Sequence, residues 1–241
     1  MLSKATALEG YTLVSPDGDV GRVKEFYFDD QQCAIRYLVA GTGAWRSEKK
    51  VLIPPRALGP LFPEKRHIAV ELTAQQIENS PSASCGVPMS QPTGETRLPD
   101  PGSPRYWGGP HMWGSPPDSG RERDPWRSPI RGERAWRMHL GSTRDVSGYQ
   151  AQAVNGDSGC VEDVVIDDET WAIRYWIIDT GNRWAGRTVL LDAHWVERVS
   201  WSESTVYLKL ARETVRNLPE YTEAALLALE YETRLRRHYD P

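Results

Sequence analysis

Short runs of alternating hydrophobic and polar positions along this chain predict β-strands buried on one face. The stretch 20–28 is rich in β-branched and aromatic residues, the polar stretch 29–32 has turn chemistry, and 33–40 is again strand-like. These three stretches predict a β-hairpin. Further short strands are expected at 51–53 and at 68–72, where every second residue is aliphatic.

The same pattern occurs a second time at a constant offset of 138 positions, with residues 17–81 matching 155–219 without a gap. Helical turns at 73–79 and 211–217 end each copy before a proline. Several short strands at close spacing favour a small barrel that closes its own edges. We therefore expect a mainly β protein with two small β-barrels related by internal duplication, each with a short helix. Identical residues at the offset are Gly18 and Gly156, Gly21 and Gly159, Ile35 and Ile173, Arg36 and Arg174, and Tyr37 and Tyr175.

The segment between the copies has a different composition. In residues 82–136, Pro, Gly and Ser fill 25 of the 55 positions. This segment therefore has little apolar surface to bury and is expected to be a disordered linker. After Pro219 the pattern becomes helical, with Leu227, Tyr231 and Leu235 at spacings of four. The expected organisation is a first barrel at 1–81, the linker at 82–136, a second barrel at 137–219 and an amphipathic C-terminal helix at 220–241.

Charge and cysteine content narrow the function classes. Residues 1–81 are net neutral and residues 137–241 are net −5 within a total of −4, which disfavours nucleic acid as a partner. Three unpatterned cysteines suggest a reducing compartment. Because there is no signal-peptide pattern and no apolar run of transmembrane length, the expected location is the cytoplasm.

No motif in the chain indicates catalysis, a metal or a cofactor. The five histidines are scattered, no Cys-x-x-Cys or His-x-x-x-His spacing occurs, and phosphate-binding glycine motifs are absent. The acidic pairs 29–30 and 167–168 are interpreted as turn formers, because adjacent strand residues point to opposite faces. We expect no enzyme, no catalytic residue, no metal site and no cofactor.

Tryptophan enrichment in the second copy is the main candidate binding signal. These residues either pack against the linker or tail, or form an aromatic binding face. Arg174, like Arg36 in the first copy, either pairs with a turn carboxylate or contacts a partner. The residues predicted to bind a partner are Trp171, Trp176, Trp184, Trp195, Arg174, Leu227, Tyr231 and Leu235.

Both copies resemble the PRC-barrel family. The resemblance rests on a Gly-x-x-Gly-x-Val start, an acidic pair, an Ile-Arg-Tyr strand and a following Val-Leu strand, and it covers about two thirds of the chain, including both repeats. It implies a small β-barrel with a short helix that binds proteins, as in the cytoplasmic part of the photosynthetic reaction-centre H subunit and in a ribosome maturation factor. The matched motifs begin at Gly18 and Gly156 and continue through Ile35, Ile173 and Val189.

The expected function is a non-enzymatic protein-interaction or scaffolding module that binds a protein partner or a second copy of itself as a homodimer. Two alternatives follow from the resemblance. One is an RNA-linked factor in ribosome assembly, and the other is an accessory protein of a membrane or photosynthetic complex that acts through a partner. An enzyme or ligand carrier with a pocket between the barrels is a further class, for which no residue pattern gives specific support.

Overall fold

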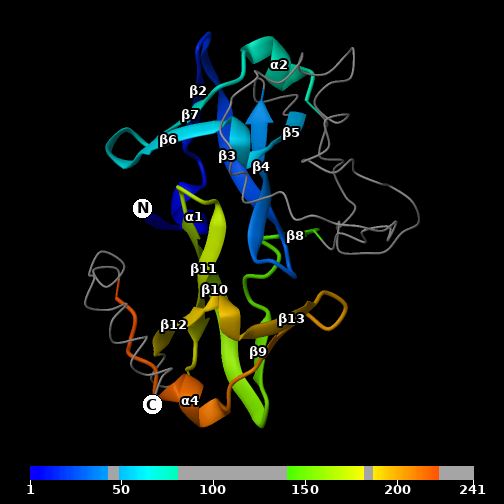
Figure 1. The fold of residues 1–241 in the computed structure, drawn as a ribbon, viewed down its shortest axis with the longest axis vertical. Helices are drawn as coiled ribbons and strands as arrows, with labels where there is room; N and C mark the ends of the chain where they lie inside the picture. The colour runs from blue at the N-terminus through cyan, green and yellow to red at the C-terminus, as the bar shows by residue number, and fades with distance from the viewer. Residues whose placement is uncertain (43–48, 81–139, 182–186, 223–241) are drawn as a thin grey trace, which may run out of the picture.

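A computed structural model describes residues 1–42, 49–80, 140–181 and 187–222. We call residues 1–80 the N-terminal half and residues 140–222 the C-terminal half. Figure 1 shows the two halves one above the other along the longest axis, with the N-terminus near the middle of the molecule. The predicted linker and nearly all of the predicted tail helix lie outside the described residues.

The strands of the two halves follow one another in the same order and are offset by about 138 positions, whereas the helical turns at 5–8 and 63–65 have no counterpart among the described residues. The N-terminal half contains β1 (Leu2–Lys4), α1 (Ala5–Leu8), β2 (Thr12–Ser15), β3 (Gly18–Asp29), β4 (Ala34–Thr42), β5 (Lys49–Ile53), η1 (Pro55–Ala57), β6 (Leu58–Phe62), η2 (Pro63–Lys65), β7 (His67–Val70) and α2 (Ala74–Glu78). The C-terminal half contains β8 (Leu140–Ser142), β9 (Gln150–Ala153), β10 (Gly156–Asp167), β11 (Ala172–Asp179), β12 (Thr188–Asp192), η3 (Ala193–Trp195), β13 (Val196–Ser200), β14 (Thr205–Leu208) and α4 (Arg212–Arg216). The mainly β class is confirmed.

The two hairpins predicted from the strand-like runs on either side of a polar turn are present. Strands β3 and β4 pair antiparallel around the first polar turn, and β10 and β11 do the same around the second. Both turns use their first aspartate as expected, because Asp29 accepts the backbone N–H of Gln31 at 2.9 Å and Asp167 accepts that of Glu169 at 3.1 Å. The helical turn at 74–78 is also present and has a capping box formed by Thr73 and Gln76.

The expectation that each barrel closes its own edges is wrong for the described residues. Hydrogen bonds link the strands into one open sheet of order β13-β14-β9-β10-β11-β4-β3-β2-β7-β6, with β6 and β13 at the two ends. Strand β5 pairs with β4, and the chain then enters η1 through Pro54 and Pro55, which have no N–H to donate to a ladder. The chain leaves η1 as β6, which pairs with β7 and does not return to β5.

The two halves exchange their first strands. Strand β1 of the N-terminal half pairs with β10, with Ser3 opposite Ile166, and β8 of the C-terminal half pairs with β3, with Gly141 opposite Phe28. Strands β4 and β11 also meet, in a single pair between Ala34 and its counterpart Ala172. Each half therefore completes the sheet of the other.

One hydrophobic cluster runs through both halves as a result of this exchange. Its largest fully buried side chains among the described residues are Trp176, Phe26 and Phe28. Because the cluster is continuous, the core cannot be divided into two closed interiors along the sequence repeat.

Candidate protein-binding surfaces

The surface along which the halves meet, which we call the seam, is built around β1, β8 and the turns before β4 and β11. Two backbone hydrogen bonds cross it symmetrically. The Ile35 N–H donates to the Trp171 carbonyl at 2.9 Å, and the Ile173 N–H donates to the Cys33 carbonyl at 2.7 Å. Cys33 and Trp171, which are counterparts in the repeat, both have left-handed backbones with φ near +50°. The turn geometry, and with it the seam, thus has approximate two-fold symmetry.

Two of the tryptophans predicted to form a binding face lie inside the protein. Trp171 is 5% exposed and Trp176 is 0% exposed. Their rings contact side chains of the N-terminal half, with centroids 6.0 Å apart for Trp171 and Phe26 and 5.9 Å apart for Trp176 and Phe28. Neither indole is available to an external partner in this structure, because the other half of the same chain covers it.

Trp201, another of the tryptophans that enrich the second copy, contacts the N-terminal half across the seam. Its indole N–H donates to Asp30 Oδ2 at 3.0 Å, and its ring lies 5.8 Å from that of Phe28. The ring covers Gly141 so closely that a Cβ added there would lie 1.6 Å from an indole carbon. The Trp201 ring can therefore pack directly against the β8 backbone only because residue 141 is glycine.

The other predicted residues are exposed, half-buried or undescribed. Arg174 is exposed and lies 3.8 Å from Asp167 Oδ2, and its counterpart Arg36 lies 2.7 Å from Asp29, so the predicted pairing with a turn carboxylate is confirmed. Trp195 is half-buried against the core of the C-terminal half. Contact of Arg174 or Trp195 with a partner stays a prediction. The residues outside the described part of the chain are Trp184, Leu227, Tyr231 and Leu235.

Two buried carboxylates, Glu25 and its counterpart Asp163, hold the exchanged segments in place. Glu25 accepts a hydrogen bond from the Ser142 hydroxyl of the C-terminal half and lies 3.0 Å from Lys50 Nζ. Asp163 accepts hydrogen bonds from the hydroxyl and the backbone N–H of Thr6 in the N-terminal half. Both carboxylates lie at β-bulges in their hairpins, which turn the side chains inward toward the other half.

Asp163 is expected to make the protein's stability depend on pH. Burial raises the pKa of this carboxyl above its ordinary value of 3.8, although the Thr6 hydrogen bonds and Lys4 oppose the shift. The folded state therefore holds the Asp163 proton more tightly than the unfolded state. This stabilisation is complete below pH 3.8 and is lost as the pH rises through the raised pKa.

Urea unfolding between pH 3.5 and 8 checks this expectation. Relative to the Asp163→Asn variant, which has no proton to lose, the wild type should lose unfolding free energy as the pH rises above 3.8. Glu71→Gln, at an exposed position outside the seam, is the control and should follow the wild type. A constant difference between wild type and Asp163→Asn across this range would contradict the assignment.

Among the described residues, the side chains do not form a redox or metal centre. Burial raises the pKa of the Cys33 thiol to about 11, so it is protonated at neutral pH, and Cys160 lies apart from it as a free, exposed thiol. Within those same ranges no three His, Cys, Asp or Glu side chains gather as metal ligands would.

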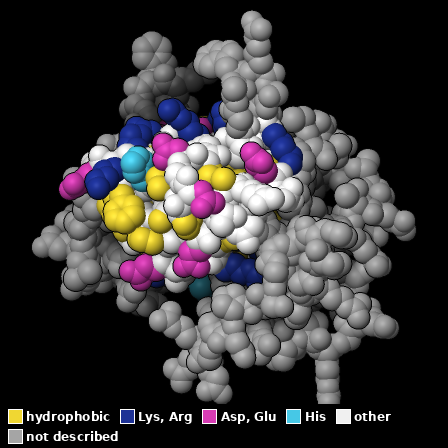
Figure 2. All heavy atoms as spheres, turned by 90° about the horizontal axis from the view of Figure 1, so that it is seen from above, with side chains coloured by type: hydrophobic (Ala, Val, Ile, Leu, Met, Phe, Trp, Pro, Cys, Tyr) yellow, Lys and Arg dark blue, Asp and Glu magenta, His cyan; other side chains and the backbone are white. Residues whose placement is uncertain are grey.

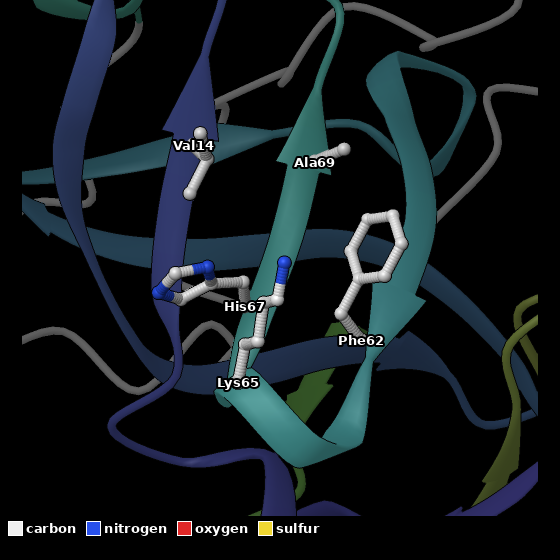
Figure 3. Close-up of a pocket in the computed structure, with 5 residues that line it drawn as sticks. All are labelled: Val14, Phe62, Lys65, His67 and Ala69. Carbon is white, nitrogen blue, oxygen red and sulfur yellow. The ribbon is translucent and has the colours of Figure 1, made fainter.

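A second candidate surface lies at the far end of the N-terminal half, on β2, β6 and β7. In Figure 2, hydrophobic side chains gather beside a histidine on this end of the molecule, with basic and acidic side chains around them. Figure 3 shows the residues that line a small hollow there, of about 140 Å³: Val14, Phe62, Lys65, His67 and Ala69. Phe62 is 46% exposed, which is unusual for a side chain of its size. We call these five residues the outer face.

The equivalent surface of the C-terminal half has polar residues that bind one another. Serine at 200 stands where the N-terminal half has Phe62. The Tyr207 hydroxyl donates to Glu203 at 2.9 Å, and the Arg198 guanidinium stacks 3.6 Å from the Tyr207 ring centroid. The two ends of the molecule therefore differ, and the end at β6 exposes a large apolar side chain.

This architecture of an N-terminal strand, a long hairpin, a short strand and a final pair before a helical turn can be compared with known families. Residues 2–71 match the PRC-barrel domain. The match begins at β1 and ends just after β7, so the exchanged strand is part of the matched PRC-barrel region. The resemblance expected from the motif beginning at Gly18 is confirmed for this region.

The PRC-barrel match does not extend to the C-terminal half, and no curated protein matches the chain. In the described ranges, no helix is both long and apolar enough to cross a membrane. The exchanged strands β1 and β8 lie upstream of the predicted repeat, whose two copies begin at residues 17 and 155. A signal was present upstream, because Leu2, Gly10 and Tyr11 recur at the same offset as Leu140, Gly148 and Tyr149.

Proposed function

We propose that this chain is a non-enzymatic protein-interaction module that binds a partner protein through the outer face of its PRC-barrel region. The observation that carries the proposal is the exposure of Phe62 beside the hollow. Exposed apolar side chains that cluster on a monomer often mark sites where another protein binds. The family match supports a role in interaction or scaffolding.

The geometry of the outer face favours one kind of partner. Val14 lies opposite Ala69 across the parallel β2–β7 pair, and Phe62 lies opposite His67 across the antiparallel β6–β7 pair. Three of these four side chains are apolar, and the Lys65 side chain extends between His67 and Phe62 (Figure 3). The surface suits a protein segment that places an apolar side chain against Phe62 and a carboxylate near Lys65.

We infer that the C-terminal half is a second PRC-like unit, so that the protein is a tandem of two such units. Support comes from the shared order of strands and from equivalent pairings, such as the parallel pairs β2–β7 and β9–β14. In such a tandem, the surface at the far end of one unit can differ from the equivalent surface of the other unit. One unit keeps an apolar face, while the other has the Tyr207, Arg198 and Glu203 cluster in its place.

A photo-crosslinking pair of variants tests the binding face. A photoreactive amino acid replaces Phe62 in one variant and its counterpart Ser200 in the other, in the full-length chain inside the cells that produce it. We expect the residue-62 variant to give a discrete crosslinked protein that the residue-200 variant does not give. Equal products from both positions, or none from position 62, would contradict the proposal.

Once that partner is purified, binding measurements give the size of the effect. Phe62→Ser, which introduces the residue of the other half, should weaken binding roughly 10- to 100-fold if Phe62 is a central contact. Tyr207→Phe, on the opposite end of the molecule, should bind like the wild type. An unchanged affinity for Phe62→Ser would reject Phe62 as the central contact.

A further inference from the structure

The seam contains contacts that require one residue from each half. Phe26 meets Trp171, Phe28 meets Trp201, and Glu9 Oε2 lies 2.8 Å from Arg144 Nη2. In every case the two residues are not counterparts in the repeat. The contacts are therefore specific to the pairing of an N-terminal half with a C-terminal half.

These contacts would be lost if a half met its own copy. Two N-terminal halves would place Cys33 against Phe26, because Cys33 is the counterpart of Trp171. Two C-terminal halves would place Val164 against Trp171, because Val164 is the counterpart of Phe26. Either arrangement loses the ring contact across the seam and alters the packed volume there.

The ion pair between Glu9 and Arg144 would also be lost if two identical halves met. The counterpart of Glu9 is Ser147, and the counterpart of Arg144 is Thr6. A pair of identical halves would thus bring Glu9 to Thr6 or Arg144 to Ser147, and neither combination is an ion pair. The indole N–H of Trp201 adds directional specificity through Asp30.

We propose that the seam is a self-sufficient, heterotypic protein interface, in which each half recognises the other without the covalent connection between them. The partner that fits the seam of either half is the opposite half of this chain, from the same molecule or from a second copy. Exchange of β1 and β8, the buried Glu25 and Asp163 contacts and the aromatic pairs together hold the halves. This inference is independent of the outer face.

Cutting the folded full-length chain tests the proposal. A recognition sequence for a site-specific protease is inserted after Gly109, the protein is purified intact and then cut, and native mass spectrometry is recorded at low micromolar concentration. We expect one species of the two fragments in 1:1 ratio. Separated fragments, or dimers of a single fragment, would overturn the proposal.

Seam variants measure what holds the cut complex together. Trp201→Ala should raise the dissociation constant of the cut fragments on the order of 100-fold, because it removes a partly buried aromatic side chain and its hydrogen bond across the interface. Tyr207→Phe, at the far end of the C-terminal half and outside the seam, is the control and should leave the constant unchanged. Equal constants for Trp201→Ala and wild type would overturn the role given to these contacts.

Mixing tests the partner's identity. Cut protein labelled with a heavy isotope is incubated with unlabelled cut protein, and masses are followed with time. Mixed 1:1 pairs should appear, each with one N-terminal and one C-terminal fragment. Mixed pairs of two like fragments would contradict heterotypic recognition.

Discussion

Trp176→Ala is expected to lower the free energy of unfolding by about 3–5 kcal/mol, enough to unfold a marginally stable protein. Trp176 is fully buried, and it is the largest of the fully buried side chains in the part of the chain that the structure describes. Its removal leaves a cavity next to Phe28, beside the strands that join the two halves. Denaturant unfolding followed by circular dichroism measures the loss.

Trp195→Ala is the matched control for this experiment. Trp195 is another tryptophan of the C-terminal half, but it is only partly buried, so its loss should cost about 1–2 kcal/mol. If Trp176→Ala kept wild-type stability but failed to bind a partner, the role predicted from sequence would be supported against the core role described here. The two variants therefore separate a structural tryptophan from a surface tryptophan.

Gly159→Ala is expected to cost roughly 3 kcal/mol, the sum of a strained backbone and a steric clash. Gly159 has φ of +118°, and a Cβ at this position would lie 1.9 Å from the Asp179 carbonyl oxygen of the paired strand. The nearest atoms belong to backbone, which cannot rotate away as a side chain can. Its counterpart Gly21 meets the Gly41 carbonyl oxygen in the same way, at 2.4 Å.

Gly18→Ala provides a matched control with the same φ of +118° and no atom within 4 Å of the added Cβ. Its cost should be limited to backbone strain, on the order of 1–2 kcal/mol. The difference between the two variants in urea unfolding isolates the close approach of β10 and β11 at Gly159. Equal losses for Gly18→Ala and Gly159→Ala would show that the clash is relieved by a small backbone shift.

The features that were predictable from sequence are those encoded within a few residues. Runs rich in β-branched and aromatic residues located β3, β4, β10 and β11, and the turn chemistry of Asp29 and Asp167 located the hairpin turns. The pairing of Arg36 with a turn carboxylate was also predictable, because the two residues are close in sequence. Local hydrogen bonding and steric preferences determine these elements with little help from the rest of the chain.

The role of the candidate tryptophans was harder to predict. The sequence indicates that a hydrophobic side chain will be covered, but it does not indicate which part of the protein or which partner covers it. The tryptophans at positions 171 and 176 are compatible either with an exposed binding surface or with a buried core. The exchange of β1 and β8 decides between them by bringing the aromatic residues of one half against those of the other. Such contacts join residues more than a hundred positions apart, and no short-range signal in the sequence encodes them.

The sequence by itself thus determined the mainly β class, the positions of the hairpins and the correspondence of residues at the offset of 138. Only the tertiary structure decided that the sheet is open, that the halves share one core, and that Phe62 is exposed while Trp176 is buried. The physical reason is that the unpaired backbone N–H and C=O groups of an edge strand can pair with any strand that the folded chain places beside it. In this protein the strand that reaches β10 is β1, and the strand that reaches β3 is β8.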